Sequence, residues 1–125
     1  MQQLQIPALS EGQTYIGAIG DKTGDVYHLI LLAGDNDLAP QQNQIEWAKS
    51  IGGELPNKLE AMMLFCHAKD QFKPESYWTG ETLIDPDDPE DDSWAWCQHF
   101  YYGLQGYGHK LNQLRARAVR RLVIE

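Results

Sequence analysis

Long apolar runs, a secretory signal and a cysteine framework are all missing from this sequence. No stretch approaches the roughly 20 apolar residues that a membrane-spanning helix needs, and residues 1–13 lack the basic start and apolar centre of a secretory signal. Cys66 and Cys97 are the two cysteines, too few for the disulfide framework of small secreted domains. We interpret them as buried thiols, with a single bridge as the alternative, and expect a cytoplasmic protein without membrane contact.

Basic residues are also scarce, and they are separated from the acidic ones. The chain has 10 Lys and Arg against 18 Asp and Glu, a formal net charge of −8. Residues 85–92 (DPDDPEDD) hold six acids and no base, whereas residues 110–125 hold five bases and one acid. The acidic loop would repel a nucleic-acid backbone, so we expect no direct nucleic-acid binding.

The length and hydrophobic content of the chain indicate one domain. With 125 residues, 42% of them hydrophobic, the chain is long enough for one core and too short for two ordinary domains. We therefore treat residues 1–125 as a single domain that begins with an irregular segment, residues 1–13.

Residues 14–82 alternate between patterns typical of strands and of helices. The β-prone runs 14–19 and 25–32 flank a turn-forming cluster and predict a hairpin. In the second run His28 interrupts a continuous apolar strand, so we place it in or near the core. Residues 34–39 are expected to form a loop, and residues 77–79 a short strand.

Two helices are expected between these strands. The first begins near Pro40 and ends before two glycines, as favoured at helix ends. The second begins at Asn57, which together with Glu60 forms the pattern of a capping box. Leu59 and Cys66 belong to its expected apolar stripe, so we expect a heavily buried helix.

The C-terminal run, residues 94–123, contains two segments that alternate as strands do. We expect residues 94–103 and 113–123 to pair as a hairpin with a wide connection bent at its glycines. By this alternation Trp94, Trp96, Phe100 and Tyr102 share one face of the first strand.

Four segments in this part of the chain form an ordered set. They are GELPNKLEAMMLF (53–65), YWTGE (77–81), AWCQHFYYGLQGYGHK (95–110) and LRARAVR (114–120). Over residues 53–123 this set resembles a family of bacterial and phage domains of unknown function, found at the C-terminal end of the Legionella collagen-like adhesin. The segments depart from the family pattern at Thr79-Gly80 and in the length of the acidic loop.

The resemblance implies an α+β, C-type-lectin-like domain with two helices and a twisted antiparallel sheet. It does not imply sugar binding, because the calcium and sugar motifs of C-type lectins are missing; Leu55-Pro56-Asn57 is the nearest approach. It also does not imply the related formylglycine-generating activity, because nothing around the two cysteines otherwise resembles that enzyme's copper site.

Two groups of candidate residues follow from this interpretation. Tyrosines near the glycine bend give rigid contact area with a polar tip, and unpaired acids attract basic partners. Candidates for partner binding are Asp85, Asp87, Asp88, Glu90, Asp91, Asp92, Tyr101, Tyr102 and Tyr107. Candidates for a structural role are Trp78, Trp96, Phe100, Arg115 and Arg117.

The favoured function is a non-catalytic, protein-binding module, phage-encoded and acting on a bacterial host protein. One form of it is an inhibitor whose acidic loop imitates phosphate charges. The alternatives are a virion-associated receptor-binding component and a metal-dependent ligand binder or enzyme. For the last of these, calcium at the acidic loop is the candidate ion, although the prolines and the missing EF-hand spacing weaken it. We expect no cofactor and no catalytic residue, because no nucleophile, base and orienting group can be assembled from the spacing.

Overall fold

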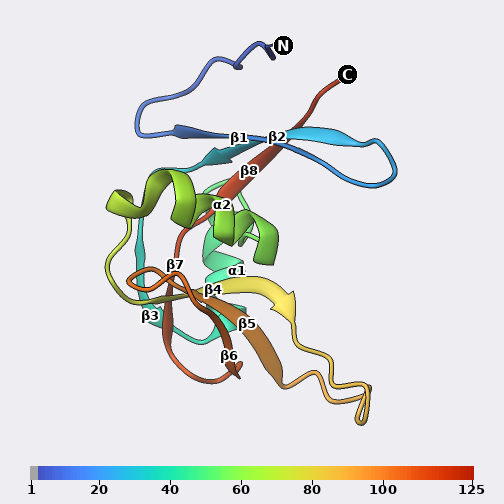
Figure 1. The fold of residues 1–125 in the computed structure, drawn as a ribbon. Helices are drawn as coiled ribbons and strands as arrows, with labels where there is room; N and C mark the ends of the chain where they lie inside the picture. The colour runs from blue at the N-terminus through green and yellow to red at the C-terminus, as the bar shows by residue number, and fades with distance from the viewer. Residues whose placement is uncertain (1–2) are drawn as a thin grey trace.

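The computed structural model describes residues 3–125, which form two β-sheets and two α-helices (Figure 1). The fold is therefore α+β, as predicted. No helix in residues 3–125 is long and apolar enough to cross a membrane. In chain order the elements are β1 (Thr14–Gly20), β2 (Val26–Leu31), β3 (Asn36–Ala39), α1 (Gln41–Ser50), α2 (Lys58–Ala68), the 3₁₀ turn η1 (Lys69–Gln71), β4 (Ser76–Thr82), β5 (Trp94–His99), β6 (Gln105–His109), β7 (Leu114–Ala116) and β8 (Val119–Val123).

The smaller sheet has three strands in the order β1-β2-β8, all antiparallel. The predicted hairpin of β1 and β2 is confirmed, with its turn at residues 21–25. A bulge lies between Tyr15 and Gly17 of β1, where Gly17 adopts a φ of 152°. Since β2 is the central strand, four of its six residues are buried, including His28, which bonds to the Tyr15 hydroxyl at 2.7 Å.

The larger sheet has five strands in the order β3-β7-β4-β5-β6. Its strands are antiparallel except for β4 and β7, which run parallel, so the expectation of a purely antiparallel sheet is wrong. Residues 36–39, expected as loop, form the edge strand β3 because Asn36 and Ala39 pair with β7.

The predicted pairing of residues 94–103 with 113–123 is also wrong, and the expected connection, residues 104–112, contains strand β6. Strand β5 pairs with β4 and β6, because Gly103 turns the chain back at a φ of 79°, and the next strand follows at once. Residues 114–123 do not form one strand either. They divide at Arg117 and Ala118 between β7, in the larger sheet, and β8, in the smaller one.

Both helices lie where the sequence predicts them. Asn57 and Glu60 form the expected capping box of α2. The buried face of α2 differs from the prediction, however: Leu59 is 58% exposed and Cys66 is exposed, while Leu64 and Ala68 are buried. The reason is the fully buried Glu60 carboxylate, which binds Arg121 of β8 and turns its own side of the helix inward.

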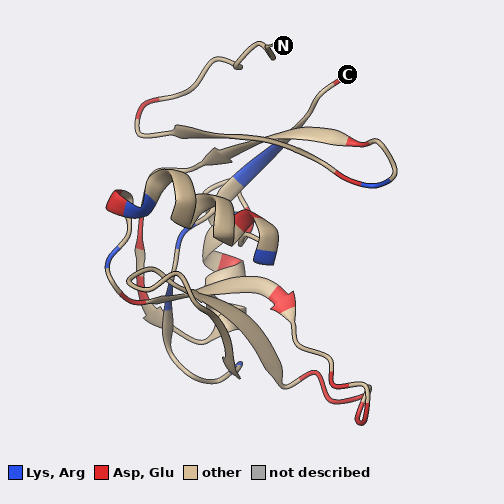
Figure 2. Ribbon diagram, viewed as in Figure 1, with Lys and Arg blue, Asp and Glu red and all other residues tan. Residues whose placement is uncertain are grey.

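Two apolar clusters hold the sheets and helices together. One lies between the smaller sheet and α2 and contains Leu29, Leu64 and Phe100. The other surrounds the fully buried Trp78, whose indole N–H donates to the Ala39 carbonyl at 3.1 Å. Acidic positions gather in the loop between β4 and β5, whereas the other charged positions are scattered over the rest of the ribbon (Figure 2).

Candidate functional site

The pairing of β5 with β6 assembles a row of aromatic side chains. Trp94 lies opposite His109 and Trp96 opposite Tyr107, and residues two apart on a strand share one face. The ring centroids of Trp94 and Tyr107 are 6.1 Å apart, those of Trp96 and Tyr107 are 6.0 Å apart, and those of Trp94 and His109 are 5.5 Å apart. We call these four residues the aromatic row. Tyr107 is 61% exposed, so the row is accessible.

A shallow hollow connects the aromatic row to the acidic loop. Trp94 and Tyr107 form one side of it, and the chain from Leu83 to Pro86 forms the other. Ile84 is half exposed in this hollow. Apolar contact area and the first carboxylate of the loop, Asp85, therefore lie on one continuous surface.

Short polar contacts give the acidic loop (residues 85–92) a defined shape. The Asp85 carboxylate accepts a hydrogen bond from the Asp87 N–H at 2.9 Å, and Asp91 accepts one from the Ser93 N–H at 2.9 Å. The hydrogen bonds with Ser93 lower the pKa of Asp91 below its usual value. These contacts hold the turns and leave the other four carboxylates exposed.

The charges of the acidic loop are not neutralised within the domain. None of its six carboxylates forms an ion pair with a Lys, Arg or His of residues 3–125. Figure 2 shows the loop extending away from the body of the molecule, with its acidic positions side by side. Within residues 3–125, no three His, Cys, Asp or Glu side chains are grouped so that they could hold a metal ion.

The structure separates the three candidate tyrosines. Tyr107 belongs to the aromatic row, but Tyr101 and Tyr102 lie in the turn after β5, their ring centroids 4.5 Å apart. Because β5 spans six residues, roughly 17–20 Å, this turn lies at the opposite end of the strand from the acidic loop. Tyr101 contacts a different hollow, beside Cys66 and Phe72.

Of the aromatic row, the sequence named only Tyr107 as a binding candidate, and two further residues of the surface were missed altogether. No sequence pattern marks Ile84 as a binding residue, since it is a single apolar residue directly before the acidic loop. Lys58 lies with its ammonium 3.5 Å from the Trp96 ring centroid, a cation–π contact between α2 and β5 that no sequence spacing indicates. The lysine covers part of the Trp96 ring, which is half buried.

Four of the five candidates for structural roles are buried in the domain, whereas Trp96 is half buried and belongs to the aromatic row. Arg115 binds Asp35 at 2.9 Å and Asp37 at 3.0 Å. Arg117 donates to the carbonyls of Gln71 and Leu32, at 2.8 and 2.7 Å. Both guanidinium groups connect distant segments, as Phe100 and Trp78 do by packing in the core.

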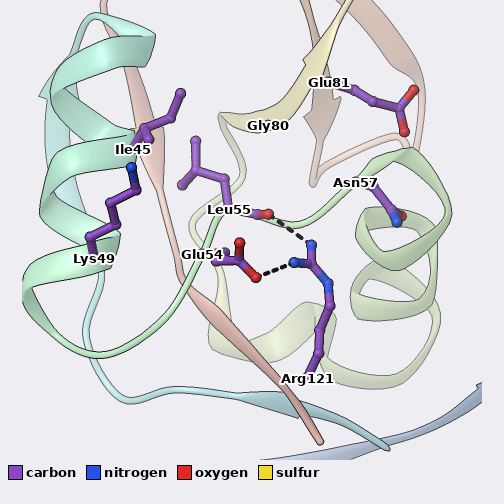
Figure 3. A pocket seen from close by; sticks show the side chains of 8 residues that line it. All are labelled: Ile45, Lys49, Glu54, Leu55, Asn57, Gly80, Glu81 and Arg121. Carbon is purple, nitrogen blue, oxygen red and sulfur yellow. Dashed lines mark hydrogen bonds and ion pairs between the residues drawn. The ribbon is translucent and has the colours of Figure 1, made fainter. Parts of the chain in front are cut away.

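A further concavity, between α1, α2, β4 and β8, is shown in Figure 3. Its volume is about 260 Å³, slightly below the usual range for ligand pockets. Its polar groups already bind one another: Arg121 donates to Glu54 and to the Leu55 carbonyl, and Glu81 accepts from the Lys58 N–H at 3.0 Å. We therefore assign this cleft to the internal network that fixes α2 to the sheets.

Neither cysteine is bonded to the other. Both thiols are free, and Cys66 is exposed on α2, contrary to the expectation of a buried thiol. Cys97 is half buried, and its burial raises the pKa of the thiol, which disfavours the reactive thiolate.

Comparison of the chain with models of protein families, with curated proteins and with solved structures finds no match.

Proposed function

We propose that this protein is a non-catalytic, protein-binding module whose binding surface consists of the aromatic row and the acidic loop. The observation that carries the proposal is the continuity of exposed aromatic rings with carboxylates that have no cationic partner in residues 3–125. The partner is a protein segment rich in Lys and Arg.

Leaving the acidic loop without a cationic partner costs electrostatic free energy. Six like charges within eight residues repel one another, and this repulsion falls when a basic partner binds. Complementary charge mainly increases the association rate and the specificity. It therefore explains selection of a basic partner, and the affinity comes from another source.

The aromatic row supplies the binding affinity. Trp and Tyr are enriched among the residues that contribute most to protein interfaces. An Arg side chain can stack on an indole or phenol ring and pair with a neighbouring carboxylate. Trp94, Tyr107 and Asp85 offer this combination within one hollow.

An inhibitory form of this function follows from the same chemistry. A run of six carboxylates imitates the negative charges of a phosphate backbone, so the loop would occupy the basic site of a nucleic-acid-binding host protein. The same charge repels nucleic acid itself. The partner would then release its nucleic acid when this protein binds.

The test is affinity capture of the tagged protein from a bacterial lysate at moderate salt. The loop variant is D87N/D88N/E90Q/D92N, which keeps Asp85 and Asp91 because their side chains hold the turns. Its matched control is E11Q/E46Q/D70N/E125Q, which removes four exposed carboxylates outside the loop. A third variant, Tyr107→Ala, removes the most exposed ring of the row.

We expect one stoichiometric basic protein to be captured by the wild type and by the control. The loop variant and Tyr107→Ala should each reduce its affinity at least about tenfold, as expected for an interface residue of high energetic weight. Capture that survives in the loop variant would contradict the role of the acidic loop. If neither the wild type nor the control captures a protein, the proposal fails.

A further inference from the structure

The outer edge of β1 is a second surface that lacks a partner. Sheet order places β1 at the edge of the smaller sheet, with β2 as its only neighbour among the strands of residues 3–125. An open edge presents unpaired N–H and C=O groups and favours pairing with another strand. Natural proteins therefore shield such edges with charge, proline, bulges or covering segments.

The sequence of β1 gives little of this protection. TYIGAIG contains no charged residue and no proline. By contrast, β8 at the other edge carries two arginines, and its first residue, Val119, is bridged to Glu54. The bulge near Gly17 interrupts β1, but Gly17 to Gly20 then keep a regular register with β2. Gly17 to Gly20 therefore form a regular stretch of edge in which every second residue turns its N–H and C=O away from β2.

Apolar side chains flank the same edge. Leu4 is 50% exposed and Ile6 is 56% exposed. Together with Tyr15, Gly17 and Ala18 they line a hollow beside β1. The backbone of residues 3–9 makes no hydrogen bond with the rest of the described chain, so this segment is held beside β1 by apolar contacts.

We propose that β1 pairs with β1 of a second copy of this chain, in an antiparallel arrangement that joins the two smaller sheets. Two identical strands that pair antiparallel satisfy the two-fold symmetry of a dimer, since residue i of one copy meets residue j of the other and j meets i. One strand pair alone falls short of the buried area of about 800 Å² per partner in a stable interface. The exposed apolar side chains of residues 3–9 supply additional area.

The distribution of charge permits this pairing despite the net charge of −8. Six of the acids lie in the loop between β4 and β5, at the far end of the molecule from β1 (Figure 2). Exposed charges further apart than the Debye length of about 8 Å are largely screened at physiological salt. Because β1 itself carries no charged side chain, two copies of this edge meet without like-charge repulsion between their strands.

The proposed dimer is compatible with the proposed protein-binding function and does not depend on it. Pairing through β1 would leave both acidic loops free, at the two ends of the assembly. Failure of the lysate capture would leave the dimer untouched, and a monomeric protein could still bind its partner.

Sedimentation velocity in 150 mM salt tests the dimer, because a self-association shifts with protein concentration. We expect the wild-type mass to rise from 14.2 kDa towards twice that value between about 5 and 200 µM. The edge variant L4K/I6K/A18K places three charges on the flanking surface. It should remain monomeric at the highest concentration.

Two controls make the result decisive. Leu111→Lys alters an apolar side chain, 74% exposed, in the turn after β6, and it should dimerise like the wild type. Circular dichroism shows whether the edge variant is folded; if it is not, Ala18→Lys alone replaces it. A second readout is amide exchange, which should slow at Gly17 to Gly20 as concentration rises, and not in β6.

A wild-type chain that stays monomeric at about 200 µM overturns the proposal, since β1 pairing would then be too weak to matter. A dimer that Leu111→Lys disrupts and the edge variant does not would place the interface elsewhere and overturn it as well.

Discussion

Replacing Glu60 with Gln should remove one of the strongest contacts between α2 and the smaller sheet. The carboxylate is fully buried and accepts four hydrogen bonds. Two come from Arg121, each at 2.7 Å, one from the Tyr27 hydroxyl at 2.7 Å and one from the Asn57 N–H at 2.8 Å. Gln has nearly the same shape, so the change removes the charge and one acceptor without opening a cavity.

The expected cost is about 3 kcal/mol, the lower end of the range for breaking a buried ion pair. The lower end applies because the Arg121 side chain is 29% exposed and keeps its contact with Glu54. For a domain of this size the loss corresponds to a fall of about 10 °C in Tm. Urea unfolding at pH 7, followed by tryptophan fluorescence, measures it.

Glu54→Gln is the matched control. The Glu54 carboxylate binds the same guanidinium group, but its side chain is 63% exposed. An exposed ion pair contributes about 1 kcal/mol or less. If both variants lose the same stability, burial does not determine the strength of this network, and the reasoning is refuted.

The pH dependence provides an independent check. Burial raises the pKa of Glu60, but hydrogen bonds from Arg121 and Tyr27 outweigh it, so the pKa lies below its ordinary value. A group with a lowered folded pKa stabilises the protein above its unfolded pKa, about 4.3, and loses this contribution as pH falls through the folded pKa. The stability difference between wild type and Glu60→Gln should therefore shrink below about pH 4.

Two further predictions concern a turn and the alkaline limit of stability. Gly103→Ala should destabilise the protein by about 2 kcal/mol or more, because it forces a side chain into a φ of 79° and places Cβ 2.6 Å from the Phe65 ring. Gly24→Ala, at a φ of 94° in open space, carries only the backbone strain and should cost about 1 kcal/mol in the same urea assay; equal losses would contradict the steric part of the argument. Burial, with hydrogen bonds to acidic side chains, raises the pKa of Tyr27 and of Tyr77 to about 12. Because a raised folded pKa stabilises below the unfolded value of 10, thermal melting should show stability falling between pH 10 and 12, and Y27F/Y77F should flatten that fall.

The candidate binding surface was predictable only in part. The acidic loop is visible in the sequence because six acids stand together without a base, and Tyr107 was named with it. Tyr101 and Tyr102 are close to Tyr107 in sequence, and this proximity predicts one shared binding surface. The turn at Gly103 separates them, since antiparallel strands return Tyr107 towards the start of β5 and leave the other two at its end.

Local chemistry in the sequence determined the two helices and the first hairpin, although it did not reveal β3 or β6. The capping box of Asn57 and Glu60 marks the start of α2, and the turn-forming residues 20–24 mark the hairpin of β1 and β2. Each of these signals acts between residues a few positions apart. Physical interactions at that range depend little on the rest of the fold, so the sequence alone suffices.

Tertiary structure decided which elements meet. The alternating pattern of residues 114–123 suits a strand in either sheet, and only packing divides it at Arg117 and Ala118. The apolar residues of α2 lie around most of the helix, so its buried side was set by the Glu60–Arg121 pair, between residues 61 positions apart. Pairings at such separations depend on the geometry of the whole chain, and no local pattern of side chains encodes them.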